Sequence, residues 1–181
     1  MPDRQQQLAH LEALGDAAQF AAQMHALIPK CPLLENFSRP EVELLAQFMT
    51  VYRAQSGAEI IREGDGGDFM LMVLEGEVEV HKRDRWNTPQ LLASVEAGRT
   101  LGEMSMIDGA PRFATCVAAE PSLIAVLDRE SLARIIVEQP LLGAKVLMEL
   151  VLMLSHRLRA TSQRLLGLLD EQSQGGAPNM L

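Results

Sequence analysis

The sequence predicts an α+β fold, in which a small barrel or jelly roll of short strands is flanked by helices and followed by one long C-terminal helix. Three observations support this prediction. Glycines recur at intervals of roughly ten residues or less between residues 54 and 128, as expected for short strands joined by tight turns. Apolar residues recur at helical spacing before and after this region. The last helical segment also carries a heptad pattern over residues 147–168.

Composition limits the class of protein. The chain has 181 residues, of which 48% are hydrophobic and only 4% aromatic. This is enough for one globular domain with appended helices and a core built from aliphatic residues and Met. The net charge of −8 argues against a dedicated nucleic-acid binder, which needs a basic face to displace counterions. A small anionic ligand is compatible with this charge, because one local arginine can neutralise it.

Three features predict a cytoplasmic protein with no membrane span. Cys31 and Cys116 lie far apart beside apolar or β-branched residues, and we interpret them as reduced core thiols. The polar N-terminus does not resemble a secretory signal. The longest apolar run, residues 147–154, contains Glu149 and is far shorter than the roughly 20 residues that a bilayer requires.

The N-terminal segment predicts a packing helix over residues 3–28, within a helical extension that spans residues 1–32. Its apolar residues recur every three or four positions, at Leu8, Leu11, Leu14, Ala18, Ala21 and Met24. Gly15 weakens this helix in the middle, and two prolines follow it. A second helix begins near Ser38, because Ser38 and Glu41 form a capping-box pattern, and it ends before Tyr52.

The next region, residues 33–139, contains the strands together with short helices. The predicted strands are Ala58–Arg62, Phe69–Leu74, Glu77–Lys82, Gln90–Val95, Ala114–Ala118 and Ser122–Leu127. A helix over Arg129–Glu138 follows, capped by Asp128. We expect Leu132, Ile135 and Ile136 to face inward from it.

The longest helix is predicted over residues 140–172, and residues 173–181 are expected to form a disordered tail. Alternating steps of four and three residues define a heptad seam at Leu147, Val151, Leu154, Leu158, Thr161, Leu165 and Leu168. The simplest partner for this seam is a second copy of the chain across a two-fold axis, and packing on the chain's own barrel is the alternative. Thr161 is the one polar member of the seam, and its polarity calls for an explanation.

The segment Leu101–Cys116 carries an anion-binding pattern. Gly102 and Glu103 open it, and Arg112 follows nine residues after the acid. A backbone opened by glycine can turn its amides toward an anion, and an arginine can close on the same anion with its planar fork of donors. The alternative is that Glu103 and Arg112 pair with each other and hold no ligand.

Three ordered segments resemble the cyclic nucleotide-binding domain family, which includes the bacterial catabolite activator protein and the regulatory subunits of cAMP-dependent kinase. The resemblance covers residues 33–169. It rests on SGAEIIREGD at residues 56–65, DFMLMVLEGEV at residues 68–78, and Gly-Glu-Met-Ser at residues 102–105 with Pro111-Arg112. It implies a β-roll, which is a jelly-roll-like double-stranded β-helix, with a long C-terminal dimerisation helix.

The family's ligand-binding roles fall on matching residues. The resemblance implies that Gly102 lets the backbone approach the ligand and that Glu103 accepts the ribose 2′-hydroxyl. The amides of Met104 and Ser105 would face the phosphate from the start of a short helix. Arg112 would neutralise the phosphate by a charge-assisted pair. No metal is implied.

Two further positions bear on the base. Thr161-Ser162 resembles a Thr-Ser pair that meets the base in the activator protein, where the serine comes from the opposite subunit. Phe113 departs from the family, which usually has a small residue after the arginine. The phenyl ring can stack on the base, reshape the pocket for cyclic di-GMP, or fill the pocket. The absence of threonine at this position removes the usual indication of cGMP, so cAMP is the best single candidate.

The function expected from the sequence is a stand-alone cyclic nucleotide sensor, a homodimer that signals by conformational change to an unidentified downstream protein. No helix-turn-helix follows the long helix, so we expect no DNA binding. The alternatives are a cyclic di-GMP effector, a ligand-free interaction module, and a DNA-binding regulator whose reading domain lies outside this sequence. We do not expect an enzyme, because the four histidines are scattered and no nucleophile has an evident base partner.

Overall fold

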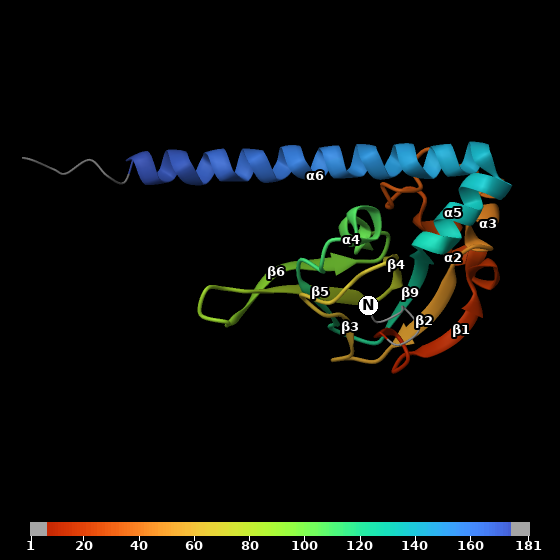
Figure 1. Ribbon diagram of the computed structural model, residues 1–181, viewed down its shortest axis with the longest axis horizontal. Coiled ribbons are helices and arrows are strands. Elements are labelled where there is room, and N and C mark those ends of the chain that lie inside the picture. The colour runs from red at the N-terminus through yellow and green to blue at the C-terminus, as the bar shows by residue number, and fades with distance from the viewer. Residues whose placement is uncertain (1–6, 175–181) are drawn as a thin grey trace, which may run out of the picture.

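The computed structural model describes residues 7–174, and all of the paired strands in this range are antiparallel. The chain forms a β-roll with helices packed on one side and a long helix running along its length (Figure 1). In chain order, the described structure begins with β1 (Glu12–Asp16), η1 (Ala17–Phe20), α2 (Ala21–Leu27), α3 (Arg39–Ala46), β2 (Thr50–Ala54), β3 (Glu59–Ile61), β4 (Phe69–Glu75) and β5 (Glu77–Arg83). The remainder are β6 (Pro89–Glu96), β7 (Thr100–Leu101), α4 (Glu103–Asp108), β8 (Thr115–Ala118), β9 (Ser122–Asp128), α5 (Arg129–Glu138) and α6 (Pro140–Gln174).

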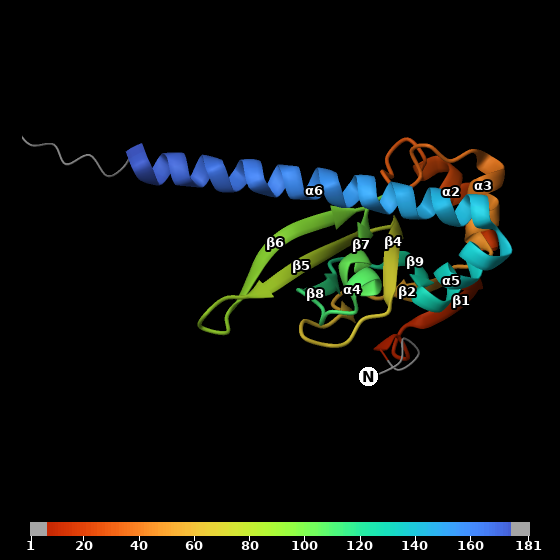
Figure 2. The same ribbon diagram turned by 45° about the horizontal axis from the view of Figure 1, so that its top comes forward.

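The roll consists of two sheets. The larger has the strand order β1-β2-β9-β4-β7, and the smaller has the order β3-β8-β5-β6. The β5–β6 hairpin extends from the roll beneath α6, while α2, α3 and α5 gather near the N-terminal end of α6 (Figure 2). The fold class predicted from the sequence, an α+β β-roll with flanking helices and a long C-terminal helix, is confirmed.

The central strand β4 shows how the core is divided. Its odd-numbered residues from Phe69 to Val73 enter the cluster between the two sheets, and its even-numbered residues from Met70 to Leu74 enter the cluster under the helices. Successive side chains of a strand point to opposite faces, so a strand that is covered on both faces has an uninterrupted apolar sequence. The sequence of β4, FMLMVLE, is buried at every position except the last.

The six predicted strands are all present, with ends that shift by at most one residue. Helix α3 starts as expected, because the Glu41 carboxylate accepts hydrogen bonds from the Ser38 amide at 2.8 Å and from its hydroxyl at 2.7 Å. Helix α5 has the predicted bounds, and Asp128 accepts from the Ser131 amide at 2.6 Å. The inward position expected for Ile136 is wrong, since its side chain is 41% exposed.

The helix expected over residues 3–28 is wrong for much of its length, and residues 3–6 lie outside the described range. Residues 12–16 instead form β1, which pairs with β2 at the edge of the larger sheet. Gly15 adopts a φ of +102°, which is incompatible with a right-handed helix. An ion pair of 2.8 Å between Glu12 and Arg53 joins the two strands. Helical structure remains in η1, a short 3-10 helix, and in α2, a short α-helix.

Helix α6 has two different faces. Leu142, Val146, Leu150 and Met153 are buried against the helical side of the core. The seam residues, in contrast, are exposed at Leu147, Val151, Leu158, Thr161, Leu165 and Leu168 and half-buried at Leu154. The alternative that the seam packs on the chain's own barrel is therefore wrong. The helix continues through Ser173 and Gln174, which were expected in the tail, and residues 175–181 lie outside the described range.

The two cysteines are free and buried, as the sequence predicts. Within residues 7–174, no helix combines the length and the apolar character needed to cross a membrane.

Candidate functional site

The anion-binding segment folds as a tight turn followed by a short helix. Strand β7 ends at Leu101, and the next residue, Gly102, adopts a φ of +82° and forms the N-cap of α4. A Cβ atom at this position would lie 2.7 Å from Nη1 of Arg112 and 3.0 Å from the carbonyl oxygen of Phe69. Glycine is therefore required here both by the backbone conformation and by the close approach of the arginine.

The start of α4 presents free amide groups. The first intrahelical hydrogen bond runs from the Met106 amide to the Gly102 carbonyl at 3.2 Å. The amides of Met104 and Ser105 precede this bond, so the helix itself offers them no acceptor. Ser105 is buried, whereas the Met104 side chain is exposed. This end of the helix is suited to an anion, because its backbone dipoles point positively outward.

Arg112 is fixed beneath the turn and is only 3% exposed. Its Nη1 donates to the carbonyl oxygen of Phe69 at 2.8 Å and to that of Gly102 at 2.9 Å, and its guanidinium lies 4.2 Å from the Phe69 ring centroid. Its Nε and Nη2 atoms are buried and have no hydrogen-bond partner. Burial lowers the pKa of Arg112 from its ordinary value, but a guanidinium stays charged in proteins.

Glu103 is buried, being 2% exposed, and it contacts the long helix. Its Oε1 accepts a hydrogen bond from Nη1 of Arg157 on α6, while its Oε2 is buried without a partner. Nη2 of Arg157 also donates to the carbonyl oxygen of Thr100 at 2.8 Å. The alternative in which Glu103 pairs with Arg112 and holds no ligand is therefore not what the structure shows.

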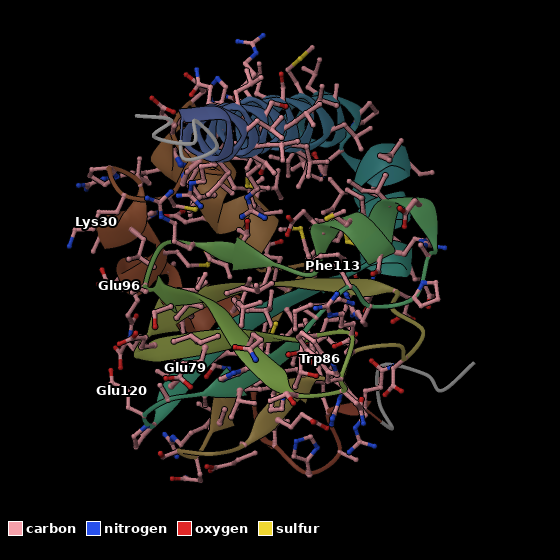
Figure 3. The ribbon with its side chains drawn as sticks, turned by 90° about the vertical axis from the view of Figure 1, so that its left-hand side faces the viewer. Lys30, Glu79, Trp86, Glu96, Phe113 and Glu120 are labelled. Atoms are coloured by element: carbon pink, nitrogen blue, oxygen red, sulfur yellow. The ribbon has the colours of Figure 1, made fainter. Side chains whose placement is uncertain are left out.

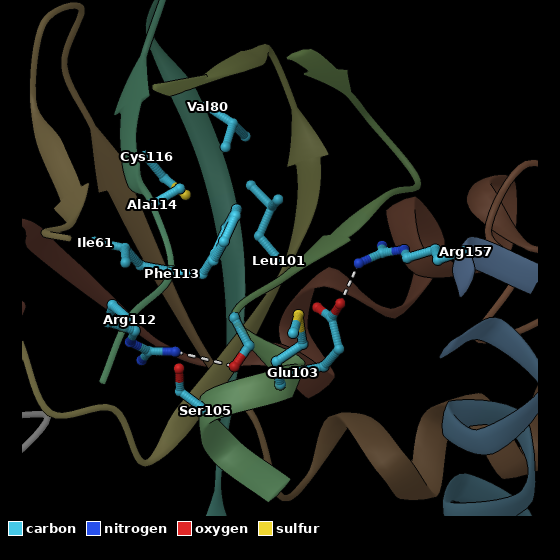
Figure 4. Close-up of a pocket in the computed structure, with 12 residues that line it drawn as sticks. Ile61, Val80, Leu101, Glu103, Ser105, Arg112, Phe113, Ala114, Cys116 and Arg157 are labelled. Carbon is cyan, nitrogen blue, oxygen red and sulfur yellow. Dashed lines mark hydrogen bonds and ion pairs between the residues drawn. The ribbon is translucent and has the colours of Figure 1, made fainter. Parts of the chain in front are cut away.

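These groups surround a cavity of about 160 Å³. One wall is polar and comes from α4, Arg112 and α6, and the other is apolar and comes from the roll (Figure 4). The lining consists of Ile61, Val80, Leu101, Gly102, Glu103, Met104, Ser105, Arg112, Phe113, Ala114, Cys116 and Arg157. Burial raises the pKa of Cys116 to about 12, so this thiol stays protonated and contributes only to the apolar wall. In the part of the chain that is described, no group of His, Cys, Asp and Glu residues is arranged to hold a metal.

Phe113 lies beside the cavity without closing it. Its side chain is 59% exposed, and the cavity remains open next to the ring. The Lys82 ammonium lies 4.6 Å from the ring centroid and donates to the Phe113 carbonyl oxygen at 2.8 Å. Glu63 in turn accepts from Lys82 at 2.6 Å. The ring is thus held at the cavity by a cation, and the alternative in which it fills the pocket does not apply to this structure.

Six of the eight residues predicted for the site line this cavity: Gly102, Glu103, Met104, Ser105, Arg112 and Phe113. Thr161 and Ser162 do not, because both are exposed on α6 beyond the point where Arg157 meets the cavity. The Thr161 hydroxyl donates to the carbonyl oxygen of Arg157 at 2.9 Å, within its own helix. Arg157, which lines the cavity, was not among the predicted site residues.

Comparison with known proteins agrees with this arrangement. The sequence profile described as "cyclic nucleotide-binding domain" matches residues 52–139. A crystal structure of a cyclic nucleotide-binding domain from Methylobacillus flagellatus KT is 38% identical, with a TM-score of 0.81, and the match covers 92% of this chain and 96% of that one. The chain belongs to the cyclic nucleotide-binding domain family. The predicted family resemblance is confirmed.

More distant members of the family are regulatory proteins. The catabolite activator protein of Thermus thermophilus is 29% identical, with a TM-score of 0.69, over 77% of this chain and 63% of that one. A cAMP-dependent protein kinase regulatory subunit from Blastocladiella emersonii is 28% identical over 65% of this chain. The chain spans 29% of the length of that regulatory subunit, so it corresponds to only one part of the subunit.

Proposed function

We propose that this protein binds a cyclic nucleotide at the cavity between α4, Arg112 and α6, with cAMP as the best candidate, and that binding is reported through α6. The observation that carries the proposal is a set of unpartnered buried atoms, namely Nε and Nη2 of Arg112 and Oε2 of Glu103. Leaving a buried polar atom unpaired costs about 1–3 kcal/mol, and more for charged groups. These atoms therefore favour a ligand that supplies the missing partners.

A cyclic nucleotide supplies them with the correct chemistry. Its phosphate offers acceptors to the two free N–H groups of Arg112 and to the amides of Met104 and Ser105. Its ribose 2′-hydroxyl offers a donor to Oε2 of Glu103. An inorganic anion satisfies the arginine but not the carboxylate, so the pair of sites favours a phosphate joined to a hydroxyl-bearing group.

The base is the least determined part of the ligand. The exposed ring of Phe113 offers a flat surface on which a purine can stack. The cavity presents one Arg112 and one Glu103, which match one phosphate and one ribose, so a single nucleotide is favoured and a cyclic dinucleotide remains the second candidate. The kinase regulatory subunit from Blastocladiella emersonii belongs to a cAMP-dependent enzyme, which supports cAMP over cGMP.

The route from ligand to signal runs through Glu103. One of its oxygens accepts from Arg157 of α6, and the other is buried without a partner in a residue that lines the cavity. A hydroxyl bound to Oε2 restricts the carboxylate and thereby favours the arrangement in which α6 stays docked on the roll. A ligand shifts such an equilibrium only by its differential affinity for the two states, typically about 1–3 kcal/mol.

The exposed seam of α6 supports the proposal that the sensor is a homodimer. Apolar residues at heptad spacing stay exposed at Val151, Leu158, Leu165 and Leu168 on a helix that continues beyond the roll (Figure 1). Two such helices related by a two-fold axis cover each other's seam. We propose that in this assembly the Thr161-Ser162 pair contacts the base or the partner helix, as the resemblance implies. In the proposed function, a downstream protein binds this surface and thereby detects the ligand-bound state.

Isothermal titration calorimetry with cAMP, cGMP and cyclic di-GMP tests ligand binding. We expect cAMP to bind, and Arg112→Ala to weaken it by roughly 100-fold or more, because two charge-assisted hydrogen bonds are lost. Arg134→Ala is the matched control, since Arg134 is exposed on α5 and pairs with Glu138 at 3.1 Å. Arg112→Lys keeps the charge and serves as a second variant if Arg112→Ala does not fold. The proposal is rejected if none of the three nucleotides produces heat or a thermal shift at millimolar concentration.

A further inference from the structure

A second cavity of about 160 Å³ lies on the other side of Arg157. Its walls come from three separate parts of the chain: the segment after α2, the β6–β7 turn, and the middle of α6. The lining residues are Pro32, Arg99, Thr100, Met153, His156 and Arg157. Lys30 and Phe113 lie on opposite sides of the roll beneath α6 (Figure 3), and Lys30 packs against the turn residue Gly98, directly before Arg99. The two cavities therefore flank α6, with Arg157 in both linings.

The charges around this cavity are of one kind. Arg99 and Arg157 are cationic, and His156 carries an N–H donor in either protonation state. None of the lining residues found for this cavity, within the described chain, is an acid. Arg157 is balanced by Glu103 on its far side, whereas the Arg99 side chain has no hydrogen bond or ion pair in the described structure. A concave site that holds one unpaired guanidinium beside a second arginine, in a chain of net charge −8, favours an anion.

We propose that this second cavity, formed by Arg99, His156 and Arg157, binds a phosphate group, either free or carried by a small phosphate monoester. Guanidinium groups match the oxygens of phosphate in pairs, and the imidazole adds a third donor. The apolar floor of Pro32 and Met153 offers no competing acceptor other than a thioether. The size of the cavity suits one phosphate with a short substituent.

Because of its position, an anion at this site is expected to change the affinity for the cyclic nucleotide, an inference that rests on the proposed function. Arg99 belongs to the roll, and His156 and Arg157 belong to α6. An anion between them relieves their mutual repulsion and draws α6 toward the roll. A cyclic nucleotide favours the same docked arrangement through Glu103. Because coupling between two binding sites is reciprocal, each ligand should raise the affinity for the other.

The test is an amide chemical-shift titration of the full chain with inorganic phosphate, and in parallel with glycerol 3-phosphate, at constant ionic strength maintained by chloride. We expect saturable shifts at Arg99, Thr100, His156 and Arg157 with at least one of the two compounds. The double variant Arg99→Gln/His156→Gln should lose these shifts, and the dispersion of its spectrum reports whether it is folded. Binding of inorganic phosphate alone identifies the free ion as the ligand, and binding of both identifies the phosphate group.

Calorimetry with cAMP then measures the coupling. Saturating phosphate should tighten cAMP binding about fivefold or more in the unmodified protein and leave it unchanged in the double variant. Absence of saturable shifts at the four residues, or shifts of the same size in the double variant, overturns the second site. Shifts confined to Met104 and Ser105 also overturn it, because they place the phosphate at α4. If these four residues respond but cAMP does not bind, the anion site stands and the proposed nucleotide function fails.

Discussion

The substitution Glu103→Gln isolates the contribution of one carboxylate to nucleotide binding. Glu103 is nearly inaccessible, and its two oxygens have different environments: one pairs with Arg157, and the other has no partner. Glutamine has the same shape, and its carbonyl oxygen can still accept from Arg157. The change therefore removes the charge while leaving the packing of α4 and α6 in place.

The size of the effect follows from the type of hydrogen bond. A hydrogen bond to a charged group contributes about 1.5–3 kcal/mol, and a neutral one about 0.5–1.5 kcal/mol. Replacing the carboxylate at Glu103 should therefore cost about 1–1.5 kcal/mol in cAMP binding, which is roughly a 5- to 10-fold loss of affinity. For 2′-deoxy-cAMP, which lacks the hydroxyl, the same substitution should have little effect.

The assay is a cycle of four titrations, with two proteins and two ligands. Removing the 2′-hydroxyl should weaken binding to the unmodified protein by about 1.5–3 kcal/mol, and binding to Glu103→Gln by about 0.5–1.5 kcal/mol. The difference between these two losses measures the interaction of the hydroxyl with the carboxylate. Glu138→Gln is the control, because Glu138 is an exposed carboxylate on α5, outside the cavity lining.

Two results would refute this reasoning. If the unmodified protein binds 2′-deoxy-cAMP as tightly as cAMP, the hydroxyl makes no contact that contributes to affinity. If the loss on removing the hydroxyl is equal in the two proteins, the hydroxyl contacts a group other than Glu103. In either case the unpartnered oxygen of Glu103 needs another explanation, such as a bound water.

Two further predictions concern the turn and the long helix. Gly102→Ala should lower the thermal midpoint and the cAMP affinity, because the new Cβ lies 2.7 Å from Nη1 of Arg112. The control is Gly57→Ala, where φ is +81° and no atom lies within 4 Å of the new Cβ. This control should lose only the strain energy of a positive φ, about 1–2 kcal/mol. Leu158→Glu should convert the dimer to a monomer in sedimentation analysis by placing like charges in the seam, whereas Gln163→Glu, an equal charge change on the opposite face of the helix, should leave it dimeric. A protein that is monomeric before any substitution contradicts the proposed assembly.

Local sequence signals were sufficient for most of the roll. The strand β4 was predictable because seven consecutive residues are apolar apart from the last, a pattern that only a strand covered on both faces explains at this length. Helix α5 was predictable because Asp128 provides an N-cap immediately before an amphipathic segment. In both cases the determining residues lie next to the element that they define.

The errors arise where the determining partner is distant in sequence. The strand β1 was predicted as a helix because Leu8, Leu11 and Leu14 have helical spacing, while its actual state depends on pairing with β2, about 40 residues further on. The two-residue strand β7 carries too little pattern to be detected. Pairing between strands is decided by tertiary contacts, and a periodicity of apolar residues does not contain them.

The candidate site shows the same difference between residues with local determinants and residues with distant ones. Gly102, Glu103 and Arg112 were predictable, because they lie within one short segment. Arg157 was not predictable, because its partner Glu103 is 54 residues away and no local pattern indicates which α6 residue faces the cavity. The heptad pattern identified the outward seam of α6 and was silent about its inward face. Thr161 and Ser162, rather than Arg157, were expected at the cavity because they resemble a Thr-Ser pair of the activator protein.

The inward and outward faces of α6 together explain why one helix can serve several roles. Its first half is anchored in the core by Leu142, Val146 and Leu150, so this part has little freedom to move. From Leu158 onward the seam is exposed, and Arg157 joins this distal half to the roll through Glu103 and the Thr100 carbonyl oxygen. Because a helix is stiff over this length, we expect a change in the contacts of Arg157 to tilt the distal segment. Both proposed ligands act on Arg157, and the proposed dimer seam runs through the same segment, so binding and assembly are expected to be coupled.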